Sequence, residues 1–252
     1  MYNRAQFKKK TALVLGSKGL IGSEIVKDLK KLGCKILEVE KGINKIKSKN
    51  QLFLTSETDD GQIKEFSAIL KKQKKIDIFI NASYPKTKNW ENLNFGTKNF
   101  SLFKTNISLH LNTYVWFSKM IAEKMKKDHT KGVILNFSSI YGKISQDMSI
   151  YKGTKMRENI AYSAIKGGIS NYTKLLAAYY GKYEIRANCI CPGGILENKM
   201  NKKFIKNYSN RVPLGRLAEV KEISKPSIFL ISEEAKYITG INLLVDGGWT
   251  CI

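Results

Sequence analysis

Apolar residues along the chain form short continuous runs that alternate with stretches of helical spacing. The first run, Thr11–Leu15, is followed by apolar positions at helical spacing up to Gly33, which is typical of a helix ended by a glycine. Further apolar runs predict strands at 35–40, 51–55, 76–81, 132–137, 185–190 and 243–245. Helical spacing returns at 63–72, 103–125 and 160–180.

This order of elements predicts βαβ units and therefore a parallel sheet. The run at 76–81 is almost continuously apolar, as expected for a strand buried on both faces. Two βαβαβ halves wound right-handed predict an α/β Rossmann fold, a doubly wound sheet of seven mainly parallel strands with helices on both faces. Because no shift in composition marks a boundary, residues 1–252 are predicted to form one domain.

Composition supports a globular protein and changes little else. Hydrophobic residues make up 42% and charged residues 26% of the chain, so a sizeable core is possible and wholesale disorder is excluded. No apolar run approaches the roughly 18–20 residues of a membrane span. The polar, basic stretch 1–10 leads directly into a strand without a signal-peptide pattern. We therefore expect a cytoplasmic protein with no membrane partner.

Metal chemistry is not indicated by the sequence. The four cysteines form no C-x-x-C pair, and neither histidine lies at ligand spacing from them. We therefore predict no metal site and interpret the cysteines as plain thiols.

The net charge of +23 comes almost entirely from lysine, since only five of the 44 basic residues are arginine. Proteins that recognise nucleic acids rely on arginine for bidentate and stacking contacts, so we expect no specific nucleic-acid partner. Two interpretations remain open. The lysines either cover solvated faces without further function, or they attract acidic substrates or partners.

A glycine-rich turn follows the first predicted strand and opens the first helix. In this position glycines permit a tight turn and let backbone N–H groups approach a pyrophosphate at the helix N-terminus. The sequence therefore predicts a dinucleotide site. Its phosphate-binding residues are predicted to be Gly16, Ser17, Lys18, Gly19, Leu20, Ile21 and Gly22.

Glu40 closes the second predicted strand, 18 residues after Gly22. A carboxylate there accepts both ribose hydroxyls and repels a 2′-phosphate, which favours NAD. Lys18 and Lys41 point the other way, since either ammonium could meet that phosphate. We predict NAD as the cofactor and keep NADP as the alternative.

Tyr162 and Lys166 lie four residues apart and so share one face of a predicted helix. A tyrosine with a pKa of about 10 is a poor base at neutral pH, but a nearby ammonium favours its phenolate. Ser139 ends a strand and can bond the reacting oxygen. On a helix further upstream, Asn106 can hold a water beside Lys166. His110, one helical turn later, is interpreted as structural.

These motifs together resemble the short-chain dehydrogenase/reductase family over essentially the whole chain. They occur in family order as the glycine turn, Asn81-Ala82-Ser83, Asn106, Ser139, Tyr162, Lys166, Arg186-Ala187-Asn188, Pro192-Gly193-Gly194, Thr239-Gly240 and Val245-Asp246-Gly247-Gly248. The resemblance implies an NAD(P)-dependent oxidoreductase, assembled as a homotetramer or homodimer, that acts on a secondary alcohol or its ketone.

The same resemblance implies particular residue roles. It implies an Asn–Ser–Tyr–Lys relay in which Tyr162 is the acid/base and Lys166 binds the nicotinamide ribose. It also implies further cofactor contacts, with Ile195 near the carboxamide. These contacts are Asn81, Ala82, Pro192, Gly193 and Ile195.

The segment 143–161 is an insertion between Ser139 and Tyr162, which are 23 residues apart, farther than in most of the family. We expect it to loop out beside the open side of the pocket and to contact the substrate. Tyr141, just before the insertion, and Tyr151 and Arg157 within it are the predicted contacts. Trp90, in the loop after the fourth strand, is either a sugar-stacking wall or a packing residue.

The insertion and the motifs around it resemble a narrower group of proteins. With 82–90 and 139–142, it is similar to flagellin-modification dehydrogenases associated with legionaminic-acid-type nonulosonate pathways. This implies a small-molecule substrate derived from a sugar or amino sugar. The alternatives are a 3-oxoacyl-carrier-protein reductase, whose acidic carrier would suit a basic surface, and a cofactor-binding partner subunit without turnover of its own.

Overall fold

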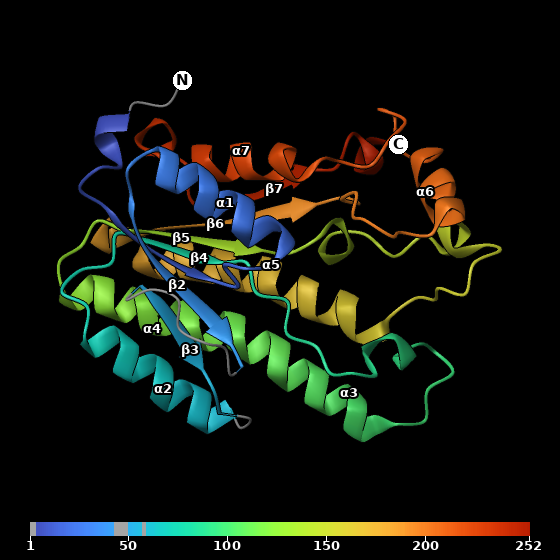
Figure 1. The fold of residues 1–252 in the computed structure, drawn as a ribbon, viewed down its shortest axis with the longest axis horizontal. Helices are drawn as coiled ribbons and strands as arrows, with labels where there is room; N and C mark the ends of the chain where they lie inside the picture. Colours follow the sequence, from blue (N-terminus) through green and yellow to red (C-terminus); the bar gives the residue numbers. More distant parts are fainter. Residues whose placement is uncertain (1–3, 43–49, 57–58) are drawn as a thin grey trace.

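The computed structural model describes residues 4–42, 50–56 and 59–252, and its core is one seven-stranded sheet (Figure 1). The strand order is β3-β2-β1-β4-β5-β6-β7, and every pair of neighbours is parallel. The strands are β1 Thr11–Leu15, β2 Lys35–Lys41, β3 Gln51–Leu54, β4 Ile78–Asn81, β5 Val133–Phe137, β6 Arg186–Pro192 and β7 Asn242–Val245. The doubly wound fold predicted from the sequence is confirmed, and each predicted strand agrees to within two residues.

Helices cover both faces of this sheet (Figure 1). Helices α1 and α7 pack on one face, and α2, α4 and α5 pack on the other. The helices are α1 Leu20–Lys31, α2 Asp59–Lys71, α3 Phe100–Ile107, α4 Thr113–Lys127, α5 Ile160–Tyr180, α6 Lys202–Ser209 and α7 Val220–Ile231. None of these helices is both long enough and apolar enough to cross a bilayer.

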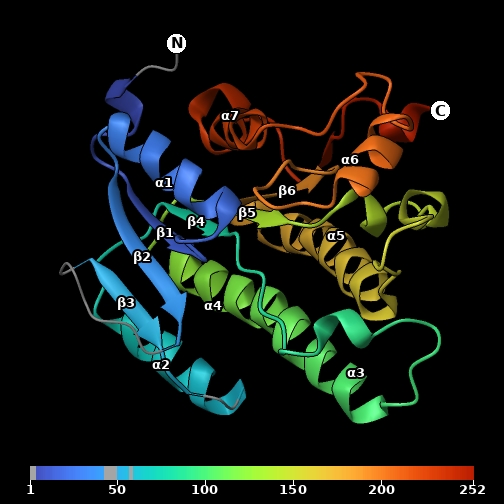
Figure 2. The ribbon, with the colours of Figure 1, turned by 45° about the vertical axis from the view of Figure 1, so that its right-hand side comes forward.

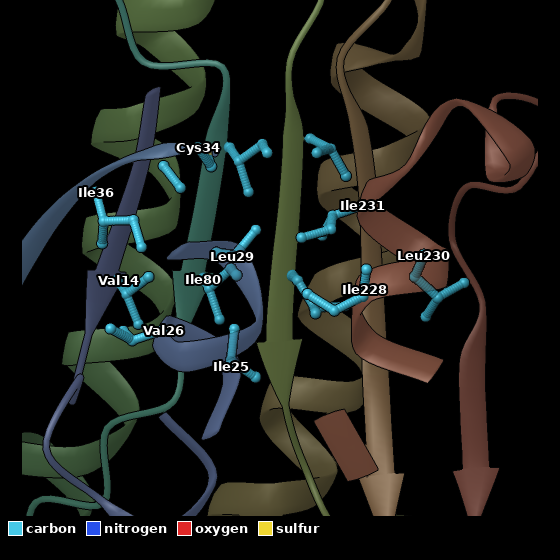
Figure 3. Close-up of a cluster of buried hydrophobic side chains, with 14 of the residues drawn as sticks. Val14, Ile25, Val26, Leu29, Cys34, Ile36, Ile80, Ile228, Leu230 and Ile231 are labelled. Atoms are coloured by element: carbon cyan, nitrogen blue, oxygen red, sulfur yellow. The ribbon is translucent and has the colours of Figure 1, made fainter. Parts of the chain in front are cut away.

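The two-residue period of the strands divides the core into two layers. Val14 and Ile80 join the layer under α1 and α7, where Figure 3 shows them beside Leu29. Their neighbours Leu13 and Phe79 face α2, α4 and α5 instead. All five side chains are fully buried, which explains why the sequence of the central strands is a continuous apolar run.

Two helical features differ from the expectation. The helix expected over 103–125 is two helices joined by a π-helical turn at Ser108–Asn112, which inserts one residue into the regular repeat. Helices α6 and α7 were not predicted. Helix α6 is only eight residues long, and α7 contains Pro226, which interrupts a helical pattern in the sequence.

The segment 143–161 is anchored and does not loop out freely, which corrects the expectation. Ile150 is buried in a small cluster with residues of α6, and the Tyr151 ring stacks on Phe204 with centroids 6.1 Å apart. The side chain of Asn207 also donates a 3.1 Å hydrogen bond to the Ile150 carbonyl. Figure 2 shows the resulting contact between α6 and the segment before α5. Shortening this segment would therefore remove part of a packed core.

Candidate active site and cofactor cleft

A cleft of about 650 Å³ opens at the carboxyl ends of the strands. It lies beside the point between β1 and β4 where the winding of the sheet reverses, the usual ligand site of doubly wound folds. Most of the predicted cofactor residues line it, namely Gly16, Gly19, Leu20, Ile21, Glu40, Ala82, Tyr162, Lys166, Pro192, Gly193 and Ile195.

The glycines at 16 and 22 are required by close backbone contacts. Gly16 has φ +78°, and a Cβ there would lie 2.7 Å from Cα of Ser83. A Cβ on Gly22 would lie 2.0 Å from the carbonyl oxygen of Gly16. Gly22 does not line the cleft. It lets α1 begin directly against the turn, so that the N-terminus of the helix faces the cleft.

Glu40 is held in place by the glycine turn itself. Its Oε1 accepts hydrogen bonds from the Ser17 hydroxyl at 2.7 Å and from the Lys18 amide at 2.6 Å. The carboxylate therefore lies at the cleft wall with its position already fixed. The Lys18 ammonium instead lies over the Phe53 ring, 4.9 Å from its centroid.

Lys41 follows Glu40 in the chain and, unlike Lys18, lines the cleft. Its Nζ donates a 3.2 Å hydrogen bond to Oγ1 of Thr113, and burial lowers the pKa of Lys41 to about 8. Of the two lysines that could meet a 2′-phosphate, Lys41 lines the cleft and Lys18 does not.

Asn81 acts behind the cleft wall. Its amide nitrogen donates to the Thr113 carbonyl at 3.2 Å, and its Oδ1 accepts a 2.7 Å bond from the Ser83 hydroxyl. These bonds fix the loop after β4, which includes the lining residue Ala82, against α4.

Tyr162 and Ser139 meet as the sequence predicts. Tyr162 lies on the first turn of α5, where its N–H donates to the side chain of the N-cap residue Asn159 at 3.0 Å. Ser139 directly follows β5. Burial raises the pKa of Tyr162, and the hydrogen bond between its phenol and the Ser139 hydroxyl opposes that rise. The free site therefore holds a neutral phenol next to the serine.

Lys166 lies one helical turn further along α5 and is buried. Its Nζ donates a 3.0 Å hydrogen bond to the carbonyl of Phe137, at the end of β5. Three aromatic rings surround the same ammonium, with centroids 5.3 Å away for Tyr114, 5.6 Å for Tyr162 and 5.7 Å for Tyr84. Burial lowers the pKa of Lys166 to about 8.

Asn106 is engaged elsewhere than the sequence suggests. Its amide nitrogen donates to Oγ1 of Thr87 and to the Leu102 carbonyl, both at 2.9 Å, and its Oδ1 accepts from the Thr87 amide at 3.0 Å. Both amide protons are thus in use, and within the described part of the chain no hydrogen bond joins Asn106 to Lys166. The structure gives Asn106 the task of fixing the loop after β4.

The predicted substrate residues divide into two groups. Tyr141 and Trp90 lie edge-on to the Tyr162 ring, each with its centroid 6.4 Å away. Tyr151 lies farther out, where its hydroxyl donates to Gln146 at 3.3 Å. Arg157 is 58% exposed and pairs with the neighbouring glutamate, so the structure does not bring it to the cleft.

The cleft also contains residues that the sequence analysis did not select. The sequence did not predict that Tyr84 and Tyr114 surround the Lys166 ammonium, although the position of Tyr84 in the loop after β4 indicates a place near the cleft. The remaining lining residues are Leu15, Lys41, Ser83, Pro85, Phe137, Ser138 and Glu197.

Comparison with known proteins agrees with this geometry. A family model described as enoyl-(acyl carrier protein) reductase matches residues 18–250. A short-chain dehydrogenase of Leptospira borgpetersenii with bound NAD⁺ is 33% identical to this chain, with a TM-score of 0.86 and coverage of 99% of this chain and 96% of that one. The chain belongs to the short-chain dehydrogenase/reductase family. It is an oxidoreductase, and the prediction of an NAD(P) cofactor is confirmed.

Two curated members of the short-chain dehydrogenase/reductase family are similar in sequence. The post-translational flagellin modification protein A of Campylobacter coli is 33% identical over 178 residues, which are 71% of this chain and 69% of that protein. A 3-oxoacyl-[acyl-carrier-protein] reductase of Buchnera aphidicola is 30% identical over 96% of this chain and 98% of its own length.

We expect Gly22→Ala to weaken NAD⁺ binding by about tenfold or more, equivalent to about 1.4 kcal/mol, because the added methyl group displaces the turn that faces the pyrophosphate. Isothermal titration calorimetry measures this loss. Gly181→Ala is the matched control, since Gly181 ends α5 with helical dihedrals and open space around it. That change should leave NAD⁺ affinity unaltered and stabilise the fold by about 0.4–1 kcal/mol. Equal affinity for both variants would contradict the assigned role of Gly22.

Proposed function

We propose that this enzyme uses NAD to interconvert a secondary alcohol and a ketone of a sugar or amino-sugar derivative, in the biosynthesis of a surface glycan such as that of modified flagellin. The observation that carries the proposal is the similarity to the Campylobacter flagellin modification protein, which extends over 71% of this chain. The chemistry of the cleft supports the same class of substrate.

The proton step belongs to Tyr162. When bound, the nicotinamide supplies or accepts the hydride. In the direction of ketone reduction, the Tyr162 phenol gives its proton to the substrate oxygen and becomes a phenolate. The Ser139 hydroxyl, already bonded to that phenol, holds the same oxygen. Alcohol oxidation reverses the transfer.

Lys166 makes this step possible near neutral pH. Its ammonium is 5.6 Å from the centre of the Tyr162 ring in a buried site, where opposite charges interact more strongly than in water. The lysine therefore favours the phenolate, while burial alone disfavours it. The balance between these two effects sets the pH at which Tyr162 exchanges its proton.

The space beyond Tyr162 suits a hydroxylated ring. Tyr84 lines the cleft beside Tyr162 and offers an aromatic face on which the apolar face of a sugar can stack, whereas Trp90 is buried in a hydrophobic cluster and packs behind the Tyr162 ring. The hydroxyl of Tyr141 is buried without a hydrogen-bond partner within the described residues, and Tyr141 does not line the cleft.

NAD is the proposed cofactor because Glu40 is fixed at the cleft wall by two hydrogen bonds to one oxygen. The Leptospira structure contains NAD⁺, in agreement with that choice. Lys41 supports the alternative, NADP, because it lines the same cleft.

Self-association into a homodimer or homotetramer, in the cytoplasm, is also part of this proposal. Large apolar side chains remain exposed on the outer faces of α4 and α5, as a subunit interface requires. They are Trp116 at 42%, Leu175 at 62% and Tyr179 at 52% exposure.

A 3-oxoacyl-carrier-protein reductase is the second candidate. It is favoured by the nearly full-length similarity to the Buchnera enzyme and by the charge of +23, which would attract an acidic carrier. It has less support at the cleft, where the Tyr84 ring offers a face on which a sugar can stack.

A substrate screen decides between the two candidates. We expect NAD-dependent turnover with sugar nucleotides or amino-sugar phosphates and little with acyl thioesters. A preference for acyl thioesters would replace the sugar proposal.

Tyr162→Phe should reduce kcat by about 10²–10⁴-fold, because it removes the proton donor and little else. Tyr172→Phe on the same helix is the matched control and should keep normal turnover. A Tyr162→Phe enzyme with more than about a tenth of normal activity would refute the role of Tyr162 in proton transfer.

The cofactor choice is tested by Glu40→Gln, which removes the charge and keeps the size of the side chain. We expect weaker NAD⁺ binding and stronger NADP⁺ binding, since a neutral amide no longer repels the 2′-phosphate. Fluorescence titration with both cofactors measures the two dissociation constants. Glu184→Gln, a 63% exposed carboxylate just before β6 at the amino ends of the strands, should change neither. A normal enzyme that already prefers NADP⁺ would overturn the choice of NAD and would mean that Lys18 or Lys41 governs it.

A further inference from the structure

His110 is a buried histidine whose two ring nitrogens have no hydrogen-bond partner within the described residues. It lies in the π-helical turn Ser108–Asn112 between α3 and α4. Such turns occur often at functional sites. Leaving a buried polar group unpaired is unfavourable, so its retention at this position calls for a bound partner.

The surroundings of His110 are those of Lys166. The imidazole lies edge-on to Tyr84 with centroids 5.2 Å apart, and 5.6 Å from Tyr114. The same two rings lie 5.7 Å and 5.3 Å from the Lys166 ammonium. Trp90, 6.3 Å from the imidazole, also contacts the Tyr162 ring. The rings of Tyr84, Tyr114 and Tyr162 form an aromatic enclosure around the Lys166 ammonium, and His110 borders this enclosure.

This enclosure has polar groups that a water molecule could join. An ammonium has three N–H donors, and the bond to the Phe137 carbonyl uses one of those on Lys166. The imidazole of His110 contributes two unpaired nitrogens. A buried water needs two to four polar partners, which the two side chains supply together.

We propose that His110 is a positioning residue that holds a buried water against the Lys166 ammonium, the task that the sequence suggested for Asn106. The inference rests on the proposed oxidoreductase function. Asn106 is committed to the loop after β4, whereas His110 lies in the enclosure with its nitrogens free for a ligand. The water would orient the ammonium toward Tyr162.

The charge state of His110 suits this role. Its titratable neighbours are Lys166, Lys41, Tyr84 and Tyr114. Burial, together with the positive charges of the two lysines, lowers the pKa of the imidazole well below its usual range. The ring is therefore neutral at neutral pH, with one donor and one acceptor nitrogen. It can bind the water without placing a second positive charge beside the ammonium.

A matched pair of variants tests the proposal. Asparagine and leucine are similar in size, but only asparagine can bind a water. We expect His110→Leu to lower kcat by about tenfold, about 1.4 kcal/mol in barrier, with KM and NAD⁺ affinity unchanged. The limb of the pH profile that reports the Tyr162 phenolate should move to higher pH, because a misoriented ammonium stabilises the phenolate less. His110→Asn should restore both kcat and the profile.

The outcomes that overturn the proposal are equally specific. If the leucine and asparagine variants share the normal kcat and pH profile, His110 does not position Lys166. If both lose activity equally while remaining folded by circular dichroism, the imidazole matters for packing and not for a bound water.

A second measurement needs no turnover and no intact leucine variant. The chain has two histidines, so His129→Gln leaves His110 as the only signal in ¹⁵N-histidine-labelled protein. We expect a neutral imidazole from about pH 6 to 9, with a nitrogen shift that changes when Lys166→Met removes the ammonium. Titration near the ordinary histidine pKa, or a shift insensitive to Lys166→Met, would refute the proposal. If this coupling is found but the substrate screen yields no turnover, the proposed function fails and the positioning contact stands.

Discussion

The hydrogen bond from the Lys166 ammonium to the Phe137 carbonyl is the interaction on which the site depends. It joins the first turns of α5 to the end of β5 across the wall of the cleft. Ser139 follows β5 directly, and Tyr162 lies one turn before Lys166. Together with the 2.7 Å bond from the Ser138 hydroxyl to the Lys166 carbonyl, this contact holds the hydroxyl, the phenol and the ammonium in their relative positions.

Burying that ammonium is unfavourable for folding, but it serves the proposed reaction. Desolvation disfavours the charged lysine, which is why its pKa falls to about 8. The carbonyl bond and the faces of three tyrosine rings recover part of the cost, since aromatic faces attract cations. In the proposed reaction, the buried ammonium favours the phenolate of Tyr162. Active sites commonly hold such strained electrostatics at the expense of stability.

The sequence predicts the features that follow from strict periodicity. The strands of the parallel sheet are apolar on both faces, so their runs are visible without structure, and the spacing of four between Tyr162 and Lys166 fixes their shared helical face. Predictions from regular helical spacing fail at the π-helical turn, because one inserted residue interrupts the spacing. Asn106 precedes the turn and bonds the loop after β4, whereas His110 lies within the turn and borders the enclosure. The anchoring of Ile150 depends on α6, which is distant in the chain, so the sequence could not reveal it.

Direct titration of Lys166 is the measurement closest to the central claim. In ¹³C-lysine-labelled protein without cofactor, the Lys166 signal can be assigned as the resonance missing from Lys166→Met. A buried ammonium bonded to the Phe137 carbonyl should titrate with a pKa of about 8, below the ordinary lysine value of 10.5. A titration near 10.5 would mean that the side chain is solvated, and it would contradict an enclosed Tyr162–Lys166 pair.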